Sequence, residues 1–239
     1  QLDATHVYLG TDRGLYHTDP ALRTLRRLVL PPLDPGRIVF SLLPDAGKMW
    51  LGGGDGLWLT DPQAASASRV AGTAVLNDEP VTALTKAADG KLWIGTRTRG
   101  LFRYDPGSHQ IDHFPPQSGN PSAMSGGNIA TLLIDSRGWL WIGTQGGGVN
   151  LLKDTAVKLP KEARFVRYGL AQGLPNVLVD QLLEDRTGRI WASTDRGLAV
   201  IDKNGTVTAL QRADGVAIPD YWSNSGARLA SGELLFGGA

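Results

Sequence analysis

Three observations predict an all-β fold, specifically a β-propeller of four-stranded antiparallel blades. A strand-like segment that contains an aromatic residue, called the anchor here, recurs along the 239 residues. In the clear copies this segment is followed by a turn that contains glycine. No segment shows the 3.6-residue apolar period of a helix. The five clear copies read VYLGTDRGLY from Val7, MWLGGGDGLW from Met49, LWIGTRTRGLF from Leu92, LWIGTQGGGVN from Leu140 and IWASTDRGLAV from Ile190. A weaker sixth copy, LLFGG, begins at Leu234.

The spacing of the aromatic anchors supports this fold. The anchors are Tyr8, Trp50, Trp93, Trp141 and Trp191, with Leu235 at the same place in the sixth copy. Successive anchors are 42, 43, 48, 50 and 44 residues apart, which is the length of one propeller blade. A residue repeated at one fixed place is explained by a structural slot. We therefore expect the anchor tryptophans to pack between blades rather than to stack on a ligand.

Each copy has the pattern of a β-hairpin. The run before the first glycine is β-branched or aromatic, as strands prefer. That glycine is expected where a larger side chain would meet the next blade or strand, and its positions are Gly10, Gly52, Gly95 and Gly143, with Ser193 in the fifth copy. A second glycine supplies the positive φ of a tight turn, at Gly14, Gly56, Gly100, Gly148 and Gly197.

Two further strands complete each predicted blade. One strand and a turn of the D-x-G type precede each anchor, and a less regular fourth strand follows each hairpin. The predicted fourth strands are Leu25–Val29, Val70–Val75, Ile111–Phe114, Ala163–Tyr168 and Val207–Leu210. The blades then cover about 1–34, 35–79, 80–127, 128–174 and 175–216, with a partial blade at 217–239 of the single domain 1–239.

The two ends of the chain do not combine into one blade, because both carry the second strand. We therefore expect about five complete or nearly complete blades plus a partial one, as a fragment of a longer propeller.

The composition excludes several classes of protein. With 24 basic and 23 acidic side chains and no basic run, the chain lacks the electrostatic footprint of a nucleic-acid binder. The absence of cysteine excludes disulfides, Cys-ligated metals and a thiol nucleophile. No stretch approaches the roughly 20 apolar residues of a membrane span, and the N-terminus does not read as a signal peptide.

Several segments strongly resemble a known repeat. LWIGTRTRGLFRYDP, LWIGTQGGGVNLL and GLPNVLVDQLLEDRTGRIWASTDRGLAVID are similar to the two-component regulator propeller repeat, and SGELLFGG resembles the last repeat of such ectodomains. The resemblance implies the extracytoplasmic sensor of a membrane-anchored bacterial receptor, located in the periplasm as the ectodomain of an inner-membrane protein. It also implies a cytoplasmic histidine kinase, hybrid kinase or diguanylate cyclase output, whose motifs this chain does not contain.

A ligand is expected on the face where the hairpin turns and the connections between blades converge. Arginine forks, amides and aromatic faces there would grip an unknown small molecule or an oligosaccharide. The candidate ligand-binding residues are Arg13, Arg97, Arg99, Gln145, Arg196, Tyr221, Trp222 and Asn224. Of these, Arg97, Arg99 and Arg196 are expected to form a locally cationic rim.

No residue pattern points to a catalytic centre, a metal site or a cofactor. His109 and His113 are four residues apart, but on a strand this spacing separates them by about 13 Å. An enzyme on a propeller scaffold, a glycosidase or lyase, is the alternative function, because Asp12, Asp55 and Asp195 occupy similar turns and could point inward. That reading requires two carboxylates about 5–10 Å apart in a pocket. A scaffold that docks a partner protein or a second copy, as a homodimer, is a third hypothesis.

Overall fold

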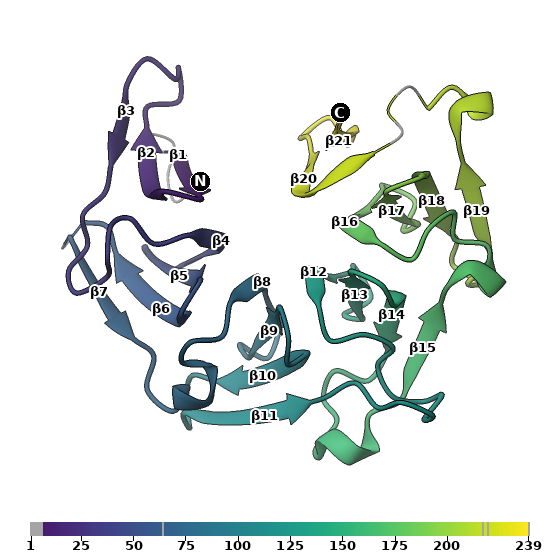
Figure 1. Ribbon diagram of the computed structural model, residues 1–239, viewed down its shortest axis with the longest axis horizontal. Helices are drawn as coiled ribbons and strands as arrows, with labels where there is room; N and C mark the ends of the chain where they lie inside the picture. Colours follow the sequence, from purple (N-terminus) through teal and green to yellow (C-terminus); the bar gives the residue numbers. More distant parts are fainter. Residues whose placement is uncertain (1–6, 64, 217, 219, 239) are drawn as a thin grey trace.

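The computed structural model describes residues 7–63, 65–216, 218 and 220–238. Six antiparallel sheets follow one another along the chain and form an open arc around a central axis (Figure 1). Each sheet has its first strand near the axis and its last strand at the periphery (Figure 1). The predicted all-β propeller architecture is therefore confirmed.

The first sheet has three strands, β1 (Val7–Thr11), β2 (Gly14–Thr18) and β3 (Leu25–Arg27). The next four sheets have four strands each. The second sheet has β4 (Val39–Asp45), β5 (Lys48–Gly53), β6 (Gly56–Asp61) and β7 (Ser66–Arg69), and the third has β8 (Val81–Lys86), β9 (Leu92–Thr96), β10 (Leu101–Asp105) and β11 (Gln110–Phe114). The fourth sheet has β12 (Ile129–Ile134), β13 (Leu140–Thr144), β14 (Gly148–Leu152) and β15 (Phe165–Tyr168), and the fifth has β16 (Val179–Glu184), β17 (Ile190–Thr194), β18 (Gly197–Ile201) and β19 (Val207–Leu210). The last sheet has two strands, β20 (Tyr221–Arg228) and β21 (Leu234–Gly238).

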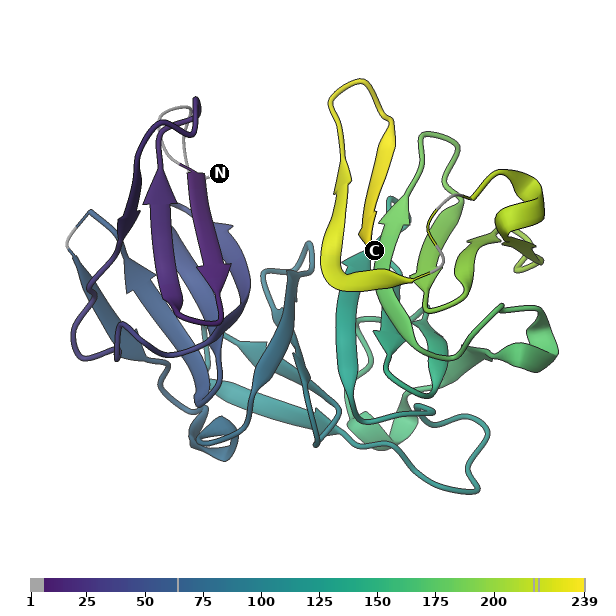
Figure 2. The same ribbon diagram turned by 45° about the horizontal axis from the view of Figure 1, so that its top comes forward.

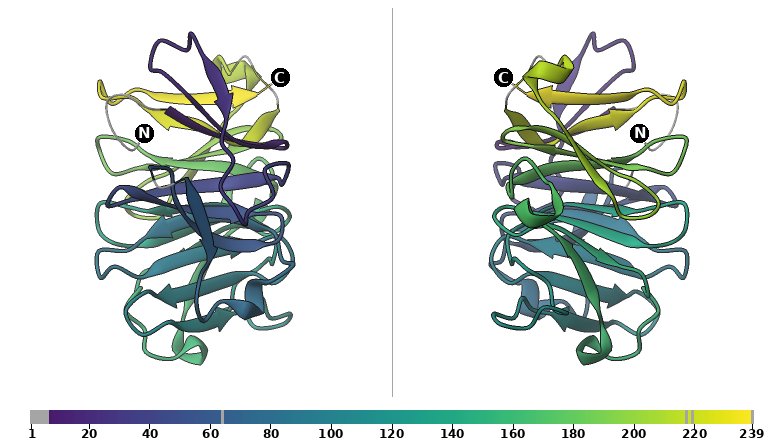
Figure 3. Two further views of the ribbon diagram at one scale, coloured as in Figure 1. Left: turned by 90° about the vertical axis from the view of Figure 1, so that its left-hand side faces the viewer. Right: turned by 90° about the vertical axis from the view of Figure 1, so that its right-hand side faces the viewer.

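The described helices are short 3-10 turns between strands: η1 (Ala74–Leu76), η2 (Pro160–Glu162), η3 (Leu170–Gln172) and η4 (Arg212–Asp214). Among the described residues, no helix has the length and apolar character needed to cross a membrane. The first sheet and the last sheet lie at the two ends of the arc (Figure 2). In edge view most strands run across the short dimension of the molecule, along the central axis (Figure 3).

One predicted strand is wrong. The fourth strand of the second sheet is β7 (Ser66–Arg69), not Val70–Val75. The apolar letters of that segment resemble a strand, but Gly72 has a φ of +77° and turns the chain into η1, where Leu76 is buried. A Cβ at Gly72 would lie 2.0 Å from the His109 carbonyl oxygen, so the segment is held against the next sheet rather than against β6. The other predicted fourth strands begin and end within two residues of those observed.

Close packing between successive sheets depends on the first glycine of each hairpin. A Cβ built at Gly52 would lie 2.4 Å from the Val81 carbonyl oxygen, and one at Gly95 would lie 2.5 Å from Ile129 Cγ2. Gly143 meets Val179 in the same way, at 2.8 Å, and Gly10 meets Val39 at 2.7 Å. In each case the neighbour is the first residue of the next inner strand. The predicted reason for the repeated glycine is therefore confirmed in these four copies.

Replacing Gly143 with alanine should lower stability, because the new Cβ would lie 2.6 Å from Thr131 Cγ2 and 2.8 Å from Val179 Cγ1. We expect a loss of roughly 1–3 kcal/mol, as for an overpacked core, measured by urea unfolding. Gly54→Ala is the control, because the nearest atoms to its Cβ lie 3.9 Å away. Equal losses in both variants would contradict the packing role of Gly143.

Three of the anchor tryptophans also make the same polar contact, at the end of the sheet away from the hairpin turn. The indole Nε1 of Trp50 donates to Asp45 Oδ2 at 2.9 Å, that of Trp141 to Asp135 Oδ2 at 2.9 Å, and that of Trp191 to Asp185 Oδ2 at 3.0 Å. Asp45 is the last residue of the first strand of its sheet, and Asp135 and Asp185 directly follow the first strand of theirs. These tryptophans thus share one environment, as the structural interpretation requires.

The third sheet lacks this contact. Ala87 stands six residues before Trp93, where Asp135 and Asp185 stand before their tryptophans. Trp93 is fully buried, and its Nε1 has no hydrogen-bond partner among the described residues. An unpaired buried donor costs about 1–3 kcal/mol.

Ala87→Asp should therefore stabilise the protein by about 1 kcal/mol, because the new carboxylate can accept from Trp93 Nε1. Asp135→Ala should destabilise it by about 1–3 kcal/mol, because it removes the same contact from Trp141. Both changes in stability are measured as shifts of the urea unfolding midpoint. Ala87→Asn and Ala87→Leu are the comparison variants, because they add a side chain of similar size that is polar but uncharged in the first and apolar in the second. If Ala87→Leu stabilised as much as Ala87→Asp, hydrophobic filling rather than the missing acceptor would explain the gain.

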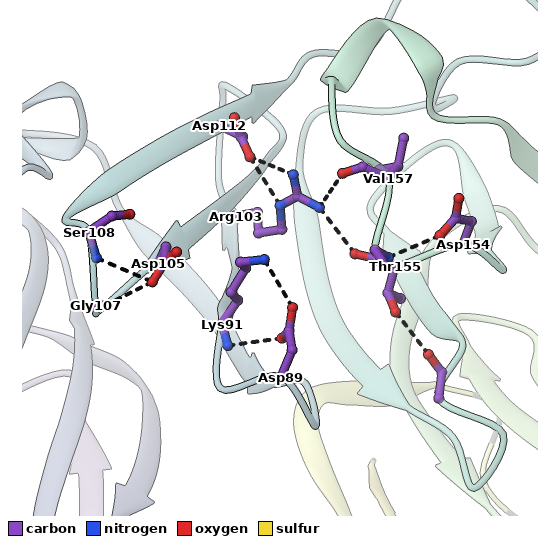
Figure 4. Close-up of polar contacts among 12 residues, drawn as sticks. Asp89, Lys91, Arg103, Asp105, Gly107, Ser108, Asp112, Asp154, Thr155 and Val157 are labelled. Atoms are coloured by element: carbon purple, nitrogen blue, oxygen red, sulfur yellow. Dashed lines mark hydrogen bonds and ion pairs between the residues drawn. The ribbon is translucent and has the colours of Figure 1, made fainter.

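A buried arginine joins the third and fourth sheets. Arg103 on β10 is 5% exposed, and its Nε and Nη2 donate to Asp112 Oδ2 at 3.1 and 2.6 Å. Its Nη1 donates to the carbonyl oxygens of Thr155 and Val157, at 3.1 and 2.7 Å, in the loop after β14 (Figure 4). The guanidinium also lies 5.5 Å from the centre of the Trp93 ring. The charge is thus satisfied within the protein, and Arg103 has a structural role.

Candidate functional site

In each of the four-stranded sheets, the first strand, which lies nearest the axis, carries a β-bulge near its start. The pairing register shifts between Val39 and Ser41 in β4, and equivalent shifts occur in β8, β12 and β16. The extra residues at these bulges are Phe40, Thr82, Ala130 and Asp180. In β20 the irregularity is wider and spans Trp222 to Ser225. Bulges redirect a side chain out of the sheet, and they are frequent beside binding sites.

The bulges of β4, β8 and β12 and the irregular part of β20 lie around one cavity at the centre of the arc. Its volume is about 740 Å³, and it receives residues from the first four sheets and from β20. Apolar residues at its wall include Phe40 and Ala130. Polar side chains that line it are Thr11, Asp12, Thr82, Arg97, Asn128, Gln145, Ser223 and Asn224. We call this space the channel cavity.

Arg97 presents the cationic group of the channel cavity. Its backbone N–H donates to the Pro80 carbonyl at 3.0 Å, which fixes the hairpin turn. Its guanidinium lies over the Phe40 ring, 4.8 Å from the centroid. The nearby carboxylate of Glu79 accepts from the backbone N–H and the hydroxyl of Thr98, both at 2.7 Å. Within the described part of the chain, the Arg97 guanidinium has no hydrogen-bond or ion-pair partner.

A buried polar cluster joins three sheets on another side of the cavity. Asp180 Oδ1 accepts from Gln145 Nε2 at 2.9 Å and from Ser223 Oγ at 3.0 Å. Gln145 Nε2 also contacts the Val179 carbonyl at 3.2 Å. Asp180 is only 4% exposed, and its Oδ2 has no hydrogen-bond partner among the described residues. The cluster therefore connects β16, the turn after β13 and β20 through one carboxyl group.

Burial raises the pKa of Asp180 to about 6. Hydrogen bonds from Ser223 and Gln145 favour the ionised form and oppose this shift, whereas the neighbouring Asp195 carboxyl adds to it. The pKa in the native state is thus above the ordinary value of 3.8. The folded protein binds more protons than the unfolded chain between these two values, so stability falls as the pH rises through about 6.

Asp180→Asn should remove this part of the pH dependence. We expect the variant to be more stable than the wild type at pH 8, by up to about 3 kcal/mol, and similar to it at pH 4, where Asp180 is protonated. Melting temperatures between pH 4 and pH 8 provide the measurement. Asp12→Asn, which changes an exposed carboxylate of the same cavity, is the control and should keep the wild-type profile. A profile for Asp180→Asn that runs parallel to the wild type would contradict the assignment.

The structure brings three of the eight candidate binding residues together. Arg97, Gln145 and Asn224 all line the channel cavity. Asn224 has a φ of +59° and its Nδ2 donates to the Phe40 carbonyl at 3.4 Å, across the arc from β20 to β4. Trp222 is 62% exposed in the same irregular part of β20, next to Ser223. Its role in binding stays a prediction.

The other candidates lie elsewhere. Arg99 donates to the Val75 carbonyl and lies over Phe102, with 5.6 Å between guanidinium and ring centroid. Arg196 lines a separate cavity of about 250 Å³ together with Arg212. The expected rim of Arg97, Arg99 and Arg196 is therefore not one site, because each arginine leaves its turn in a different direction.

Two more candidates have other surroundings. Arg13 is exposed, and its carbonyl accepts from Arg27 Nη2 at 2.6 Å. Tyr221 is 6% exposed and packs edge-on against Phe236, with 6.2 Å between ring centroids. Burial raises the pKa of its phenol. Tyr221 thus belongs to the packing of the last sheet.

The three aspartates of the enzyme alternative do not converge either. Asp12 lines the channel cavity, and Asp195 lies beside Asp180. Asp55 is 6% exposed and accepts from Trp58 Nε1 at 3.1 Å and from Arg69 Nη2 at 2.7 Å. It stands one residue later in its turn than Asp12 does, which points it into the sheet packing. Among the described residues, no group of three or more His, Cys, Asp or Glu is placed to hold a metal ion.

Sequence reasoning missed the bulge residues. The segments VFS, VTA, IAT and VDQ align at the start of the inner strands. Their first position is always Val or Ile, whereas the middle position changes from Phe40 to Thr82, Ala130 and Asp180. A position that varies between otherwise similar repeats is the signal that could have identified them. It was overlooked because alternation along a strand places this residue in a regular pleat.

Comparison with known proteins agrees with the repeats and the fold. A family model described as "Two component regulator propeller" matches residues 75–98 and 123–146. These two segments are similar to the two-component regulator propeller repeat. Each match ends in the turn after an anchor strand, at Thr98 in the third sheet and Gly146 in the fourth.

A signalling protein is similar to this chain in sequence. The chain is 27% identical over 196 residues to histidine kinase P4 of Formosa agariphila. This match covers 64% of the chain and 14% of the kinase. Its fold is similar to that of the extracellular domain described for a hybrid two-component system of B. thetaiotaomicron, with a TM-score of 0.80 and 20% identity. That match covers 97% of this chain and 31% of the other, so the chain spans a small part of both proteins.

Enzymes share the fold as well. Virginiamycin B lyase from Staphylococcus aureus is 11% identical, with a TM-score of 0.63, over 99% of this chain and 84% of the lyase. At such low identity the likeness extends to the propeller fold alone. The chemistry of the channel cavity must therefore be argued from its own residues.

Proposed function

We propose that this chain is the non-catalytic, ligand-sensing part of a periplasmic receptor domain in a bacterial two-component or related signalling system. The repeat family and the fold shared with an extracellular domain of a hybrid two-component system support this role. The parent protein would be anchored in the inner membrane and would pass the signal to a cytoplasmic output domain. The ligand would be a small molecule or an oligosaccharide.

The observation that carries the proposal is the channel cavity. Five sheets contribute to its wall, and the inner-strand bulges direct side chains of different chemistry toward it. A ligand that contacts several sheets at once can alter their relative positions, which is what a sensor requires. The Asp180 cluster ties β20 to the two preceding sheets, so a ligand beside Gln145 or Ser223 would act directly on the last sheet.

A lyase or glycosidase is the second candidate, because enzymes share this fold and Asp180 lies beside Asp195. The sensor role is favoured by the position of these carboxyl groups. Among the described residues, Asp12 is the one acidic side chain that lines the channel cavity, whereas Asp180 is buried behind Gln145 and Ser223. General acid–base cleavage requires two carboxyl groups that both reach the substrate.

A thermal-shift screen against oligosaccharides, amino acids and organic acids tests the proposal. At least one compound should raise the melting temperature of the wild type and of Asn204→Trp, which adds the same bulk to an exposed turn. The same compound should leave the melting temperature of Asn128→Trp unchanged, because this side chain would fill the channel cavity. Stabilisation that persists in Asn128→Trp would place the ligand elsewhere, and conversion of the compound into a product would favour the enzyme.

A further inference from the structure

Arg97 differs from the other arginines around the arc in having a fixed position but no partner. The contact with Phe40 orients its guanidinium, since the ring centroid lies 4.8 Å away, and the hairpin turn is held by the Pro80 carbonyl. By contrast, Arg69 is paired with Asp55, Arg103 with Asp112, and Arg99 donates to the Val75 carbonyl. In the described part of the chain, all the N–H donors of the Arg97 guanidinium remain available to a molecule in the channel cavity.

The carboxylate that binds Thr98, the next residue in the turn, does not neutralise this charge. Glu79 is 7% exposed, and both of its carboxylate oxygens are taken by Thr98, through the backbone N–H and the hydroxyl. A planar guanidinium held on an aromatic ring offers two parallel donors, which match the two oxygens of a carboxylate. A neutral ligand would not supply such a pair of oxygens.

Two other groups of the cavity offer hydrogen-bond acceptors. The Nε2 of Gln145 is used by Asp180, Ser223 and Val179, so the group that Gln145 has left for a ligand is its Oε1. Asp12 adds a carboxylate, which has no hydrogen-bond or ion-pair partner among the described residues. Acceptors of this kind require hydroxyl or amino donors on the ligand.

We infer that the channel cavity binds a small carboxylic acid that also carries hydroxyl or amino groups. Arg97 receives the carboxylate in a bidentate pair, while Gln145 Oε1 and Asp12 accept from the hydroxyl or amino donors. This inference rests on the proposed function and names the class of its ligand. It also explains why Phe40 stands at the bulge of β4: its ring holds the guanidinium toward the cavity instead of letting it turn to solvent.

Two matched sets of probes test the ligand class by calorimetry. The six-carbon set is gluconate, hexanoate and glucitol, and the four-carbon set is tartrate, succinate and erythritol. Within each set the first compound has both a carboxylate and hydroxyls, the second has the carboxylate alone, and the third has hydroxyls alone. We expect gluconate or tartrate to bind at least about 10-fold more tightly than both of its matched compounds.

Variants of Arg97 test the residue assignment. Arg97→Ala should weaken binding of the preferred acid at least about 10-fold, and Arg97→Lys should be intermediate because it keeps the charge but loses the fork. Phe40→Leu should cause a smaller loss, since it removes only the orienting ring. Arg26→Ala, which removes an exposed charge from the outer strand β3, should bind as the wild type does.

The outcomes separate this inference from the proposed function. Equal affinity for acid and polyol, unchanged affinity in Arg97→Ala, or no binding by any of the four acids would overturn the carboxylate inference. If the polyols bind and Asn128→Trp abolishes that binding, the channel cavity is still the ligand site and only the ligand class is wrong. If binding of the probes persists in Asn128→Trp, the proposed ligand site in the channel cavity is wrong as well.

Discussion

The structure depends on how closely each inner strand can approach the sheet before it. Val39, Val81, Ile129 and Val179 each occupy the space that a side chain would fill at the preceding sheet's glycine. The next residue in each strand is the bulge residue. In β4, β8 and β12 the contact that packs the sheets therefore also fixes a residue that lines the channel cavity, so that packing and cavity lining are coupled through one peptide bond.

The fifth hairpin departs from this rule. It has Ser193 in place of glycine, and the Ser193 hydroxyl is buried with no hydrogen-bond partner among the described residues. The sheet that follows is also the one whose inner strand has the wider irregularity, from Trp222 to Ser225. This places Ser223 and Asn224 in the channel cavity, to which the inner strands β4, β8 and β12 each contribute a single bulge residue. The Asp180 cluster thus adds a polar contact between the last sheet and the two sheets before it.

The two faces of the arc serve different purposes. On one face, tryptophan–aspartate pairs such as Trp141 with Asp135 repeat in three sheets, and Arg103 fastens the third sheet to the loop of the fourth. On the other face the repeats diverge, and Arg97, Gln145 and Asp180 each occur once. A rigid repeated frame with variable loops is the arrangement that allows one fold to bind different ligands.

The sequence by itself determined the repeat, the strand order, the anchor tryptophans and the need for glycine between sheets, because these depend on local pattern and on contacts that recur in every copy. It placed Arg97, Gln145 and Asn224 on one face, where the structure has the channel cavity. It did not reveal that Asp180 joins them or that Arg99 and Arg196 do not, and it mistook Val70–Val75 for a strand. Those outcomes were decided by the tertiary structure, because a bulge, a positive φ at Gly72 and the curvature of the arc set the direction of a side chain, and none of them is encoded in residue type at a single position.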